Sequence, residues 1–224
     1  MIIVTGVGRS GTSITTKVLA EITRYDLDAR WEDSVNAGLE HSKVVQLNSK
    51  LIQGQTCGTD FDSSLVIDRA EQWEHDIAFV VKQLYNDDTW IVKDPRFCYS
   101  LDVWLHVCEH FRVEEVDDFF TDLEVVVCTR NATDVMLSVQ DTGAGMPELQ
   151  RANPHQIYGE IFNRYNNLMR ILSHFGKAPN FVRYEHFKED INAVAKNLNL
   201  NGHSVTGYVD TIVDENFNGP KTRH

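Results

Sequence analysis

The sequence has no long apolar run: no stretch approaches the roughly 18 consecutive apolar residues that a membrane-spanning helix requires. Basic residues are also in deficit, because 21 Lys and Arg stand against 33 Asp and Glu and leave a net charge of −12 over 224 residues. Nucleic acids and anionic membranes are bound through an excess of Lys and Arg. We therefore expect neither of them as a partner of this chain.

Cysteine is scarce, and the four cysteines form no CxxC pair and match no zinc-binding spacing. The histidines form no H-E-x-x-H or similar cluster, so we expect no metal site. The N-terminus shows no signal-peptide pattern, because Met1 is followed directly by strand-like residues. We expect a cytoplasmic protein with reduced thiols at Cys57, Cys98, Cys108 and Cys128.

Short β-rich runs alternate with longer amphipathic stretches, which is typical of a parallel sheet covered by helices. The expected strands cover residues 2–5, 90–93, 123–129 and 180–184. Apolar residues at helical spacing predict helices from residue 13 to 22 and around residues 44–51, 77–84, 101–108, 135–139, 154–175 and 191–198. We predict a single α/β domain over residues 1–224.

The segment Gly-Val-Gly-Arg-Ser-Gly-Thr-Ser at residues 6–13 joins the first expected strand to the first expected helix. Unpaired N–H groups and the helix dipole attract an anion to a helix start, and glycines let the backbone wrap it closely. Thr12 and Ser13 add hydroxyl donors. The pattern predicts an anion-binding loop; the alternative is a plain glycine turn capped by Ser or Thr.

This loop departs from the P-loop of nucleotide hydrolases, which needs Lys after its second glycine. Gly6 and Gly11 have the P-loop spacing, but Thr12 stands where Lys is needed and the cation is Arg9, inside the loop. The departure argues against an ordinary ATP- or GTP-dependent enzyme.

A second anion site is predicted where the strand 123–129 passes into a helix. Arg130 ends that strand and is well placed for bidentate contact with a phosphate. Ser138, about two helical turns further on, is expected to add a hydroxyl from the same side. The alternative is a surface arginine with a serine that faces its own helix. Two anion sites at the carboxyl ends of parallel strands fit a nucleotide with both 5′ and 3′ charged groups.

Both motifs resemble those of sulfotransferases that use 3′-phosphoadenosine 5′-phosphosulfate (PAPS). Residues 9–13, Arg-Ser-Gly-Thr-Ser, are similar to the family's 5′-phosphosulfate loop, and residues 130–138 are similar to its 3′-phosphate motif, Arg-Asn-x-x-Asp-x-x-x-Ser. The resemblance implies a P-loop-like three-layer fold, PAPS as co-substrate and 3′-phosphoadenosine 5′-phosphate (PAP) as product. The donor-binding residues that it implies are Gly8, Arg9, Ser10, Gly11, Thr12, Ser13, Arg130 and Ser138.

The resemblance continues along residues 2–200. Lys-Asp-Pro-Arg at residues 93–96 looks like a segment of bacterial-type members, whose Lys approaches the transferring group. Tyr184, in a late Tyr-Glu motif, corresponds to a tyrosine near the adenine end of the donor. Residues 36–40 resemble an acceptor segment that ends in Glu and are one residue shorter here. The Lys-Thr-His motif of the cytosolic hormone-modifying branch is absent, and residues 201–224 match weakly.

Sulfuryl transfer needs charge neutralisation at the leaving oxygen and a base for the acceptor's proton. Arg9 and Lys93 are expected to neutralise charge, so that no metal is required. Glu40 is the hypothetical base, with Glu32 and Asp33 as rivals. The alternative for Glu40 is a solvated carboxylate at a helix start, where the helix dipole favours it.

The expected reaction is therefore sulfuryl transfer from PAPS to a hydroxyl or amine of a small-molecule, glycan or peptide acceptor. Loops at residues 25–40, 54–66 and 143–153 are expected to shape the acceptor pocket. The net negative charge disfavours a polyanionic acceptor. Two other functions stay open at this point: a P-loop nucleotide kinase, and a protein that binds PAPS or another nucleotide without turnover.

Overall fold

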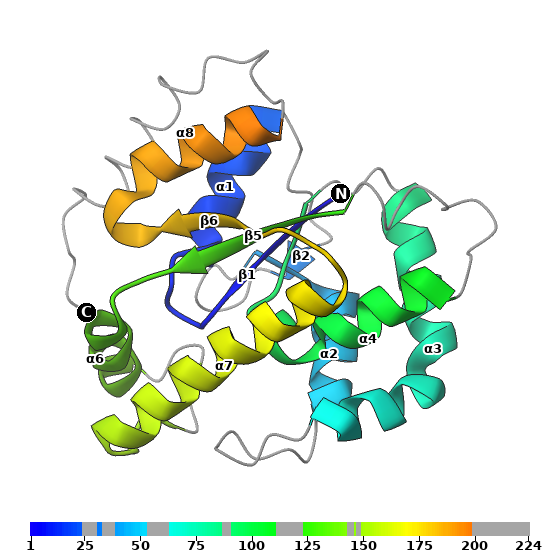
Figure 1. Cartoon of the computed structure of the whole chain (residues 1–224), viewed down its shortest axis with the longest axis horizontal. Helices are drawn as coiled ribbons and strands as arrows, with labels where there is room; N and C mark the ends of the chain where they lie inside the picture. The colour runs from blue at the N-terminus through cyan, green and yellow to red at the C-terminus, as the bar shows by residue number, and fades with distance from the viewer. Residues whose placement is uncertain are drawn as a thin grey trace.

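The computed structural model describes residues 1–23, 31–32, 39–52, 63–86, 91–110, 123–142, 146 and 149–198. Its centre is a parallel sheet of four strands in the order β4-β1-β5-β6 (Figure 1). The strands are β1 (Ile2–Gly6), β4 (Ile91–Lys93), β5 (Glu124–Thr129) and β6 (Asn180–Arg183). All three pairings are parallel, so the carboxyl ends of the strands meet at one edge of the sheet.

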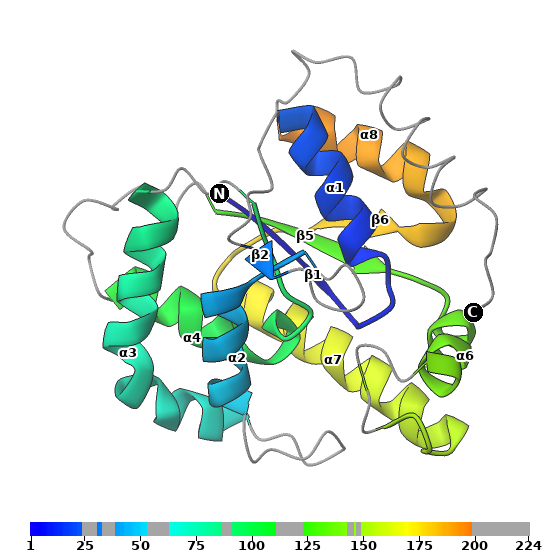
Figure 2. The ribbon, with the colours of Figure 1, turned by 180° about the vertical axis from the view of Figure 1, so that it is seen from behind.

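Helices cover both faces of this sheet (Figures 1 and 2). On one face lie α1 (Thr12–Thr23) and α8 (Phe187–Asn197), and on the other lie α4 (Phe97–His110) and α7 (Pro154–His174). Outside α4 pack α2 (Ser42–Ile52) and α3 (Ser63–Asn86), while α6 (Ala132–Thr142) lies beside α7. The predicted α/β architecture, a parallel sheet flanked by helices, is confirmed.

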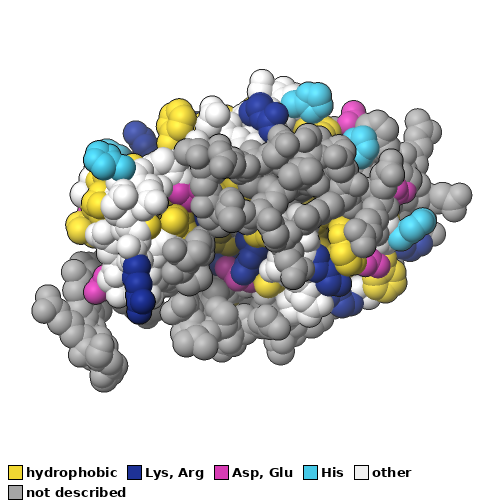
Figure 3. Space-filling model, turned by 90° about the horizontal axis from the view of Figure 1, so that it is seen from below, with side chains coloured by type: hydrophobic (Ala, Val, Ile, Leu, Met, Phe, Trp, Pro, Cys, Tyr) yellow, Lys and Arg dark blue, Asp and Glu magenta, His cyan; other side chains and the backbone are white. Residues whose placement is uncertain are grey.

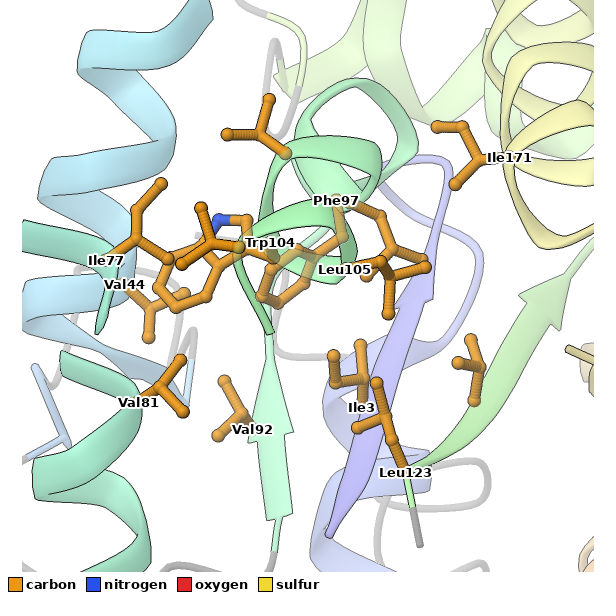
Figure 4. Close-up of a cluster of buried hydrophobic side chains, with 14 of the residues drawn as sticks. Ile3, Val44, Ile77, Val81, Val92, Phe97, Trp104, Leu105, Leu123 and Ile171 are labelled. Carbon is orange, nitrogen blue, oxygen red and sulfur yellow. The ribbon is translucent and has the colours of Figure 1, made fainter. Parts of the chain in front are cut away.

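The alternation of side chains along β1 divides the core between the two faces. Ile2 and Val4 belong to the apolar cluster under α1 and α8, whereas Ile3 belongs to the cluster under α4. In that second cluster Phe97 meets Trp104 edge to face, with ring centroids 5.7 Å apart (Figure 4). A third cluster joins the loop after β1 to α6 and α7.

Two predicted boundaries differ clearly from the structure. The helix predicted around residues 77–84 begins at Ser63, since charged residues in its first half dilute the apolar repeat. The last strand stops at Arg183 and passes into a short 3-10 helix, η2 (Tyr184–His186). The Arg183 N–H donates to the Asp190 carboxylate of α8 at 2.9 Å, a bond that draws it to α8 as the strand ends.

A two-stranded antiparallel sheet was not predicted. It pairs β2 (Trp31–Glu32) with β3 (Glu40–His41), and two residues are too few to show the alternation typical of a strand. This pairing matters for the site because Glu40 lies in β3, immediately before α2.

The described part of the chain contains no helix that is both long and apolar enough to cross a membrane. On the face drawn in Figure 3, Lys and Arg side chains of the described residues lie next to Asp and Glu side chains. The cysteines Cys98, Cys108 and Cys128 are free, and Cys57 lies outside the described residues. Burial raises the pKa of these three thiols to about 11, 12 and 12, so they stay protonated at neutral pH.

Candidate functional site at the carboxyl edge of the sheet

At two positions of the loop after β1, the backbone conformation and the surrounding atoms leave room only for glycine. Gly6 has a φ of 146°, and a Cβ there would lie 2.3 Å from the carbonyl oxygen of Cys128. Gly11 has a φ of 96°, and a Cβ there would lie 2.8 Å from the ring of Tyr184. Arg9 itself adopts a φ of 71°, in the left-handed region that side chains rarely occupy. The loop thus has positive φ values at three residues, Gly6, Arg9 and Gly11, and it ends where α1 begins.

The start of α1 supplies the hydroxyls predicted for this loop. Thr12 is the first residue of α1, and Ser10 and Thr12 are both buried, whereas Ser13 is half-buried. Gly8 is buried and Arg9 is exposed. The first N–H groups of the helix have no partner within the helix itself, so the loop and α1 offer donors to an anion at this point.

Arg9 and Ser138 are in direct contact, although 129 residues separate them in the chain. Arg9 Nε donates a hydrogen bond to Ser138 Oγ at 2.8 Å, from the loop to the middle of α6. Arg130 Nη1 donates to the carbonyl oxygen of Arg9 at 3.4 Å. The structure therefore brings the first motif and the second motif to one place, because β1 and β5 are neighbouring parallel strands that end at the same edge.

Tyr184 completes this cluster from a third strand. It follows β6, the neighbour of β5, and its ring lies against Gly11. The guanidinium carbon of Arg130 lies 4.4 Å from the centre of the same ring. Among the described residues, Arg130 Nε is buried and has no hydrogen-bond partner. The guanidinium of Arg130 is thus held beside an aromatic ring with one N–H left without a hydrogen bond.

Lys93 and Glu40 form an ion pair at the end of β4. Lys93 Nζ lies 2.7 Å from Glu40 Oε1, and the side chains of Lys93 and Glu40 are 2% and 18% exposed. Arg96 Nη1 lies 3.7 Å from the other carboxylate oxygen of Glu40. Glu40 belongs to β3 and not to the first turn of α2, so it is held by two cations and not by a helix start.

Asp94, the next residue, is fully buried and fully bonded. Its carboxylate accepts hydrogen bonds from Asn48 Nδ2 at 2.9 Å, from Arg96 N at 2.9 Å and from Arg96 Nη1 at 3.0 Å. Burial raises the pKa of Asp94, while the charge of Arg96 and the hydrogen bond from Asn48 oppose the rise. This carboxylate positions Arg96, and sequence reasoning missed it because only the fold brings Asn48 of α2 to the end of β4.

Several predicted residues lie outside this geometry. The backbone of Glu32 pairs with that of Glu40 across β2 and β3, but its side chain and all of Asp33 lie outside the described residues. So do residues 201–224 and most of the loops expected at the acceptor side, 25–40, 54–66 and 143–153. Within the described residues, no group of three His, Cys, Asp or Glu side chains is arranged to hold a metal ion.

The edge of the sheet combines a glycine-containing loop at a helix start, an arginine with one unpaired buried N–H, an aromatic ring beside both, and a carboxylate paired with a buried lysine. None of the family models, curated proteins or solved structures compared with this chain gives a significant match.

Proposed function

We propose that this chain is a PAPS-dependent sulfotransferase. It moves a sulfuryl group to a hydroxyl or amine of a small-molecule, glycan or peptide acceptor and releases PAP. The observation that carries the proposal is the meeting of Arg9, Arg130, Ser138 and Tyr184 at one edge of the sheet, from three separate strand ends. The position of the loop between the central strand β1 and α1 also supports a P-loop-like fold.

In this proposal the donor is bound at both of its charged ends. The loop, with Gly8, Arg9 and Ser10 followed by Gly11, Thr12 and Ser13, takes the 5′-phosphosulfate on its N–H and hydroxyl donors. Arg130 and Ser138 take the 3′-phosphate, and Tyr184 offers its ring to the adenine. A nucleotide without a 3′-phosphate offers no ligand to Arg130, so we expect the site to bind PAPS more tightly than ATP.

The transfer step is an in-line displacement at sulfur. The acceptor oxygen or nitrogen forms a bond to sulfur, the bond from sulfur to the bridging phosphate oxygen breaks, and that oxygen leaves with the electron pair as part of PAP. Arg9 and Lys93 neutralise the charge that grows on the leaving oxygen. The acceptor's proton passes to the Glu40 carboxylate, which acts as general base.

The Lys93–Glu40 ion pair suggests an order for donor binding and activation of the acceptor. In the structure the two side chains neutralise each other at 2.7 Å. The sulfonate of a bound donor is a second anionic partner for Lys93, and a lysine shared in this way releases Glu40 toward the acceptor. We therefore expect the donor to bind before the acceptor becomes reactive.

The competing functions make different predictions about ligands. A P-loop kinase binds ATP, but Thr12 stands where its phosphate-binding Lys is required. Isothermal titration with PAP and with ATP separates the two: we expect micromolar binding of PAP and at least about 30-fold weaker binding of ATP, the equivalent of about 2 kcal/mol. Tight binding of ATP without binding of PAP contradicts the proposal.

Turnover separates an enzyme from a binding protein. Radiolabelled PAPS, incubated with the chain and a panel of phenols, sugars, amines and tyrosine peptides, is expected to yield labelled product and stoichiometric PAP. Binding of PAP without transfer to any acceptor, and without slow hydrolysis of PAPS, indicates a nucleotide-binding protein.

A further inference from the structure

A buried amide connects α2 to the turn after β4. Asn48 is completely buried, and its Oδ1 accepts hydrogen bonds from Ser100 Oγ at 2.7 Å and from Trp104 Nε1 at 2.8 Å, both on α4. Trp104 reaches from α4 to Val44 of α2 through the apolar cluster (Figure 4). Because the indole N–H of Trp104 can only donate, the amide oxygen must face Trp104 and Ser100, and the amide nitrogen must face Asp94.

From Asn48 a series of polar contacts, two hydrogen bonds and one ion pair, continues to Glu40. Asn48 Nδ2 donates to Asp94 Oδ2, Asp94 Oδ1 accepts from the Arg96 guanidinium, and the same Arg96 nitrogen lies 3.7 Å from Glu40 Oε2. Each polar group in this chain satisfies the next one. Asn48 and Asp94 are completely buried, so the removal of Asn48 leaves the Asp94 carboxylate without one of its donors and loosens its hold on Arg96.

The backbone provides a second connection between the same two residues. Glu40 lies in β3, which leads directly into α2 at Ser42, and Asn48 lies in the middle of α2. The bond from Asn48 to Asp94 therefore fixes the position of α2 relative to the end of β4. Because Glu40 immediately precedes α2, the same bond sets the position of Glu40 relative to Lys93.

We propose that Asn48 is a positioning residue for Glu40: through Asp94 and Arg96, and through the placement of α2, it holds the Glu40 carboxylate against Lys93. The inference rests on the proposed function insofar as Glu40 is the base of the reaction. The placement of Glu40 against Lys93 is tested separately below, by a measurement that needs no catalytic activity.

The matched pair of variants is Asn48→Ala and Val44→Ala. Val44 lies on the same helix, is also completely buried and belongs to the apolar cluster, but no polar contact passes through it. Both variants leave a cavity under α2 and lower the midpoint of thermal unfolding. Only Asn48→Ala removes a link to Glu40.

The first readout is the coupling between Glu40 and Lys93 in urea unfolding. Glu40→Gln, Lys93→Met and the double variant are measured in the wild-type, Val44→Ala and Asn48→Ala backgrounds. We expect the two substitutions to be non-additive in the first two backgrounds and additive in the Asn48→Ala background. Coupling that persists unchanged in the Asn48→Ala background overturns the proposal.

The second readout is catalytic. Asn48→Ala is expected to lower kcat at least tenfold while the Kd for PAP changes less than twofold, and Val44→Ala is expected to keep kcat within threefold at a temperature well below its unfolding midpoint. Equal losses of kcat in both variants show a merely structural role and overturn the proposal.

Arg96→Gln tests the same set of contacts from its other end, where the Arg96 side chain is 33% exposed. It is expected to lower kcat as well, and the double variant with Asn48→Ala is expected to lose little more than the stronger single variant. Full additivity of the two losses contradicts a single chain of contacts. If the wild-type chain transfers no sulfuryl group at all, the proposed function fails, whereas the coupling measurement still decides the role of Asn48.

Discussion

At the scale of single residues, the candidate site is defined by the contacts that fix its charged side chains and less by the number of charges. Lys93 is almost completely buried and its ammonium is paired with Glu40, while Arg130 is stacked on Tyr184 with one buried N–H unpaired. A pair of opposite charges in a site of low polarity is stabilising only in good geometry. Substitutions that keep the shape and remove the charge are therefore the most informative.

Glu40→Gln is the first such substitution. We expect turnover of PAPS to fall about 100-fold or more, the usual contribution of a general base, because Gln cannot accept the acceptor's proton. The Kd for PAP is expected to change less than twofold, since PAP carries no sulfonate to share Lys93.

The control for this substitution is Glu189→Gln, on the exposed side of α8, where the glutamate pairs with His186. It is expected to change neither quantity. Unchanged turnover in Glu40→Gln removes Glu40 from the mechanism and makes Glu32 or Asp33 the next candidates.

Arg130→Gln tests the second anion site. Loss of one charge-assisted contact of about 1.5–3 kcal/mol is expected to weaken PAP by about 10- to 100-fold. Adenosine 5′-monophosphate, which has no 3′-phosphate, is expected to bind the variant and the wild-type chain about equally. Titration of both nucleotides against both proteins gives the answer, and equal weakening of the two contradicts a 3′-phosphate role for Arg130.

Gly11→Ala tests the contact between the loop and Tyr184. The added Cβ would lie 2.8 Å from the Tyr184 ring, and the alanine would have to keep a φ of 96°. We therefore expect the free energy of unfolding to fall by about 1–3 kcal/mol and PAP to bind more weakly.

Gly159→Ala, inside α7 with no atom near the new Cβ, is the matched control. It is expected to be neutral or to stabilise the chain by about 0.5–1 kcal/mol. Chemical unfolding of both variants measures the difference, and equal free energies of unfolding contradict the expected strain at Gly11.

At the scale of elements, α4 and α7 join through buried charged side chains that lie outside the candidate site. Tyr99 of α4 bonds to Glu160 of α7, and Arg164 Nε bonds to Tyr99 at 3.0 Å and to Glu160 at 2.7 Å. Asp102 lines a cavity of about 220 Å³ between the two helices. Burial raises the pKa of Asp102 to about 6, although the Val103 N–H and Arg170 oppose the rise.

Asp102 gives the α4–α7 contact a pH dependence of definite sign. Because its pKa is higher in the folded chain than in the unfolded chain, the folded state holds the proton between about pH 4 and pH 6, and its contribution to stability falls as the pH rises through that window. Asp102→Asn is therefore expected to raise the free energy of unfolding at pH 8 by at most about 3 kcal/mol and to change little at pH 4.

Urea unfolding at the two pH values measures this effect. Asp141→Asn, on the exposed end of α6, removes the same charge and is expected to show no such difference. A destabilised Asp102→Asn at pH 8 contradicts the assignment.

Elements were also the level at which sequence reasoning was most and least accurate. The strand 2–5 and the helix 154–175 were predicted to within one residue, because a run of buried apolar residues and a capped amphipathic repeat are local signals. Asn153 and Gln156 form a capping box at the start of α7, which fixes its first residue. The two-residue strands around Glu40 were missed because their pairing is not local.

The site was predictable in part for the same reason. Arg9, Arg130 and Tyr184 each follow a strand, and parallel strands end together, so their convergence follows from the fold class. The link from Asn48 to Asp94 does not follow from the fold class, since it depends on how α2 packs beside the turn after β4. Sequence spacing carries no information about a contact between two elements that are not neighbours in the chain.

At the scale of the whole molecule, the net charge of −12 does not prevent a cationic site. Arg9, Arg130, Lys93 and Arg96 all lie at or just beyond the ends of β1, β5 and β4. An acidic protein can therefore bind a small anion locally while its overall field still repels large polyanions.

The contact between Arg9 and Ser138 also has a consequence for biosynthesis. The two residues are 129 positions apart, and Tyr184, which closes on Gly11, is made later still. Contacts at such sequence separations form late, because the entropy cost of closing a long loop comes before the contact can stabilise the fold. A growing chain on the ribosome thus carries the glycine loop from the beginning but lacks the contact of Tyr184 with Gly11, and with it the complete proposed donor site, until β6 has joined the sheet. We expect stalled nascent chains that expose residues 1–175 to be unable to bind PAP, and those that expose residues 1–198 to bind it.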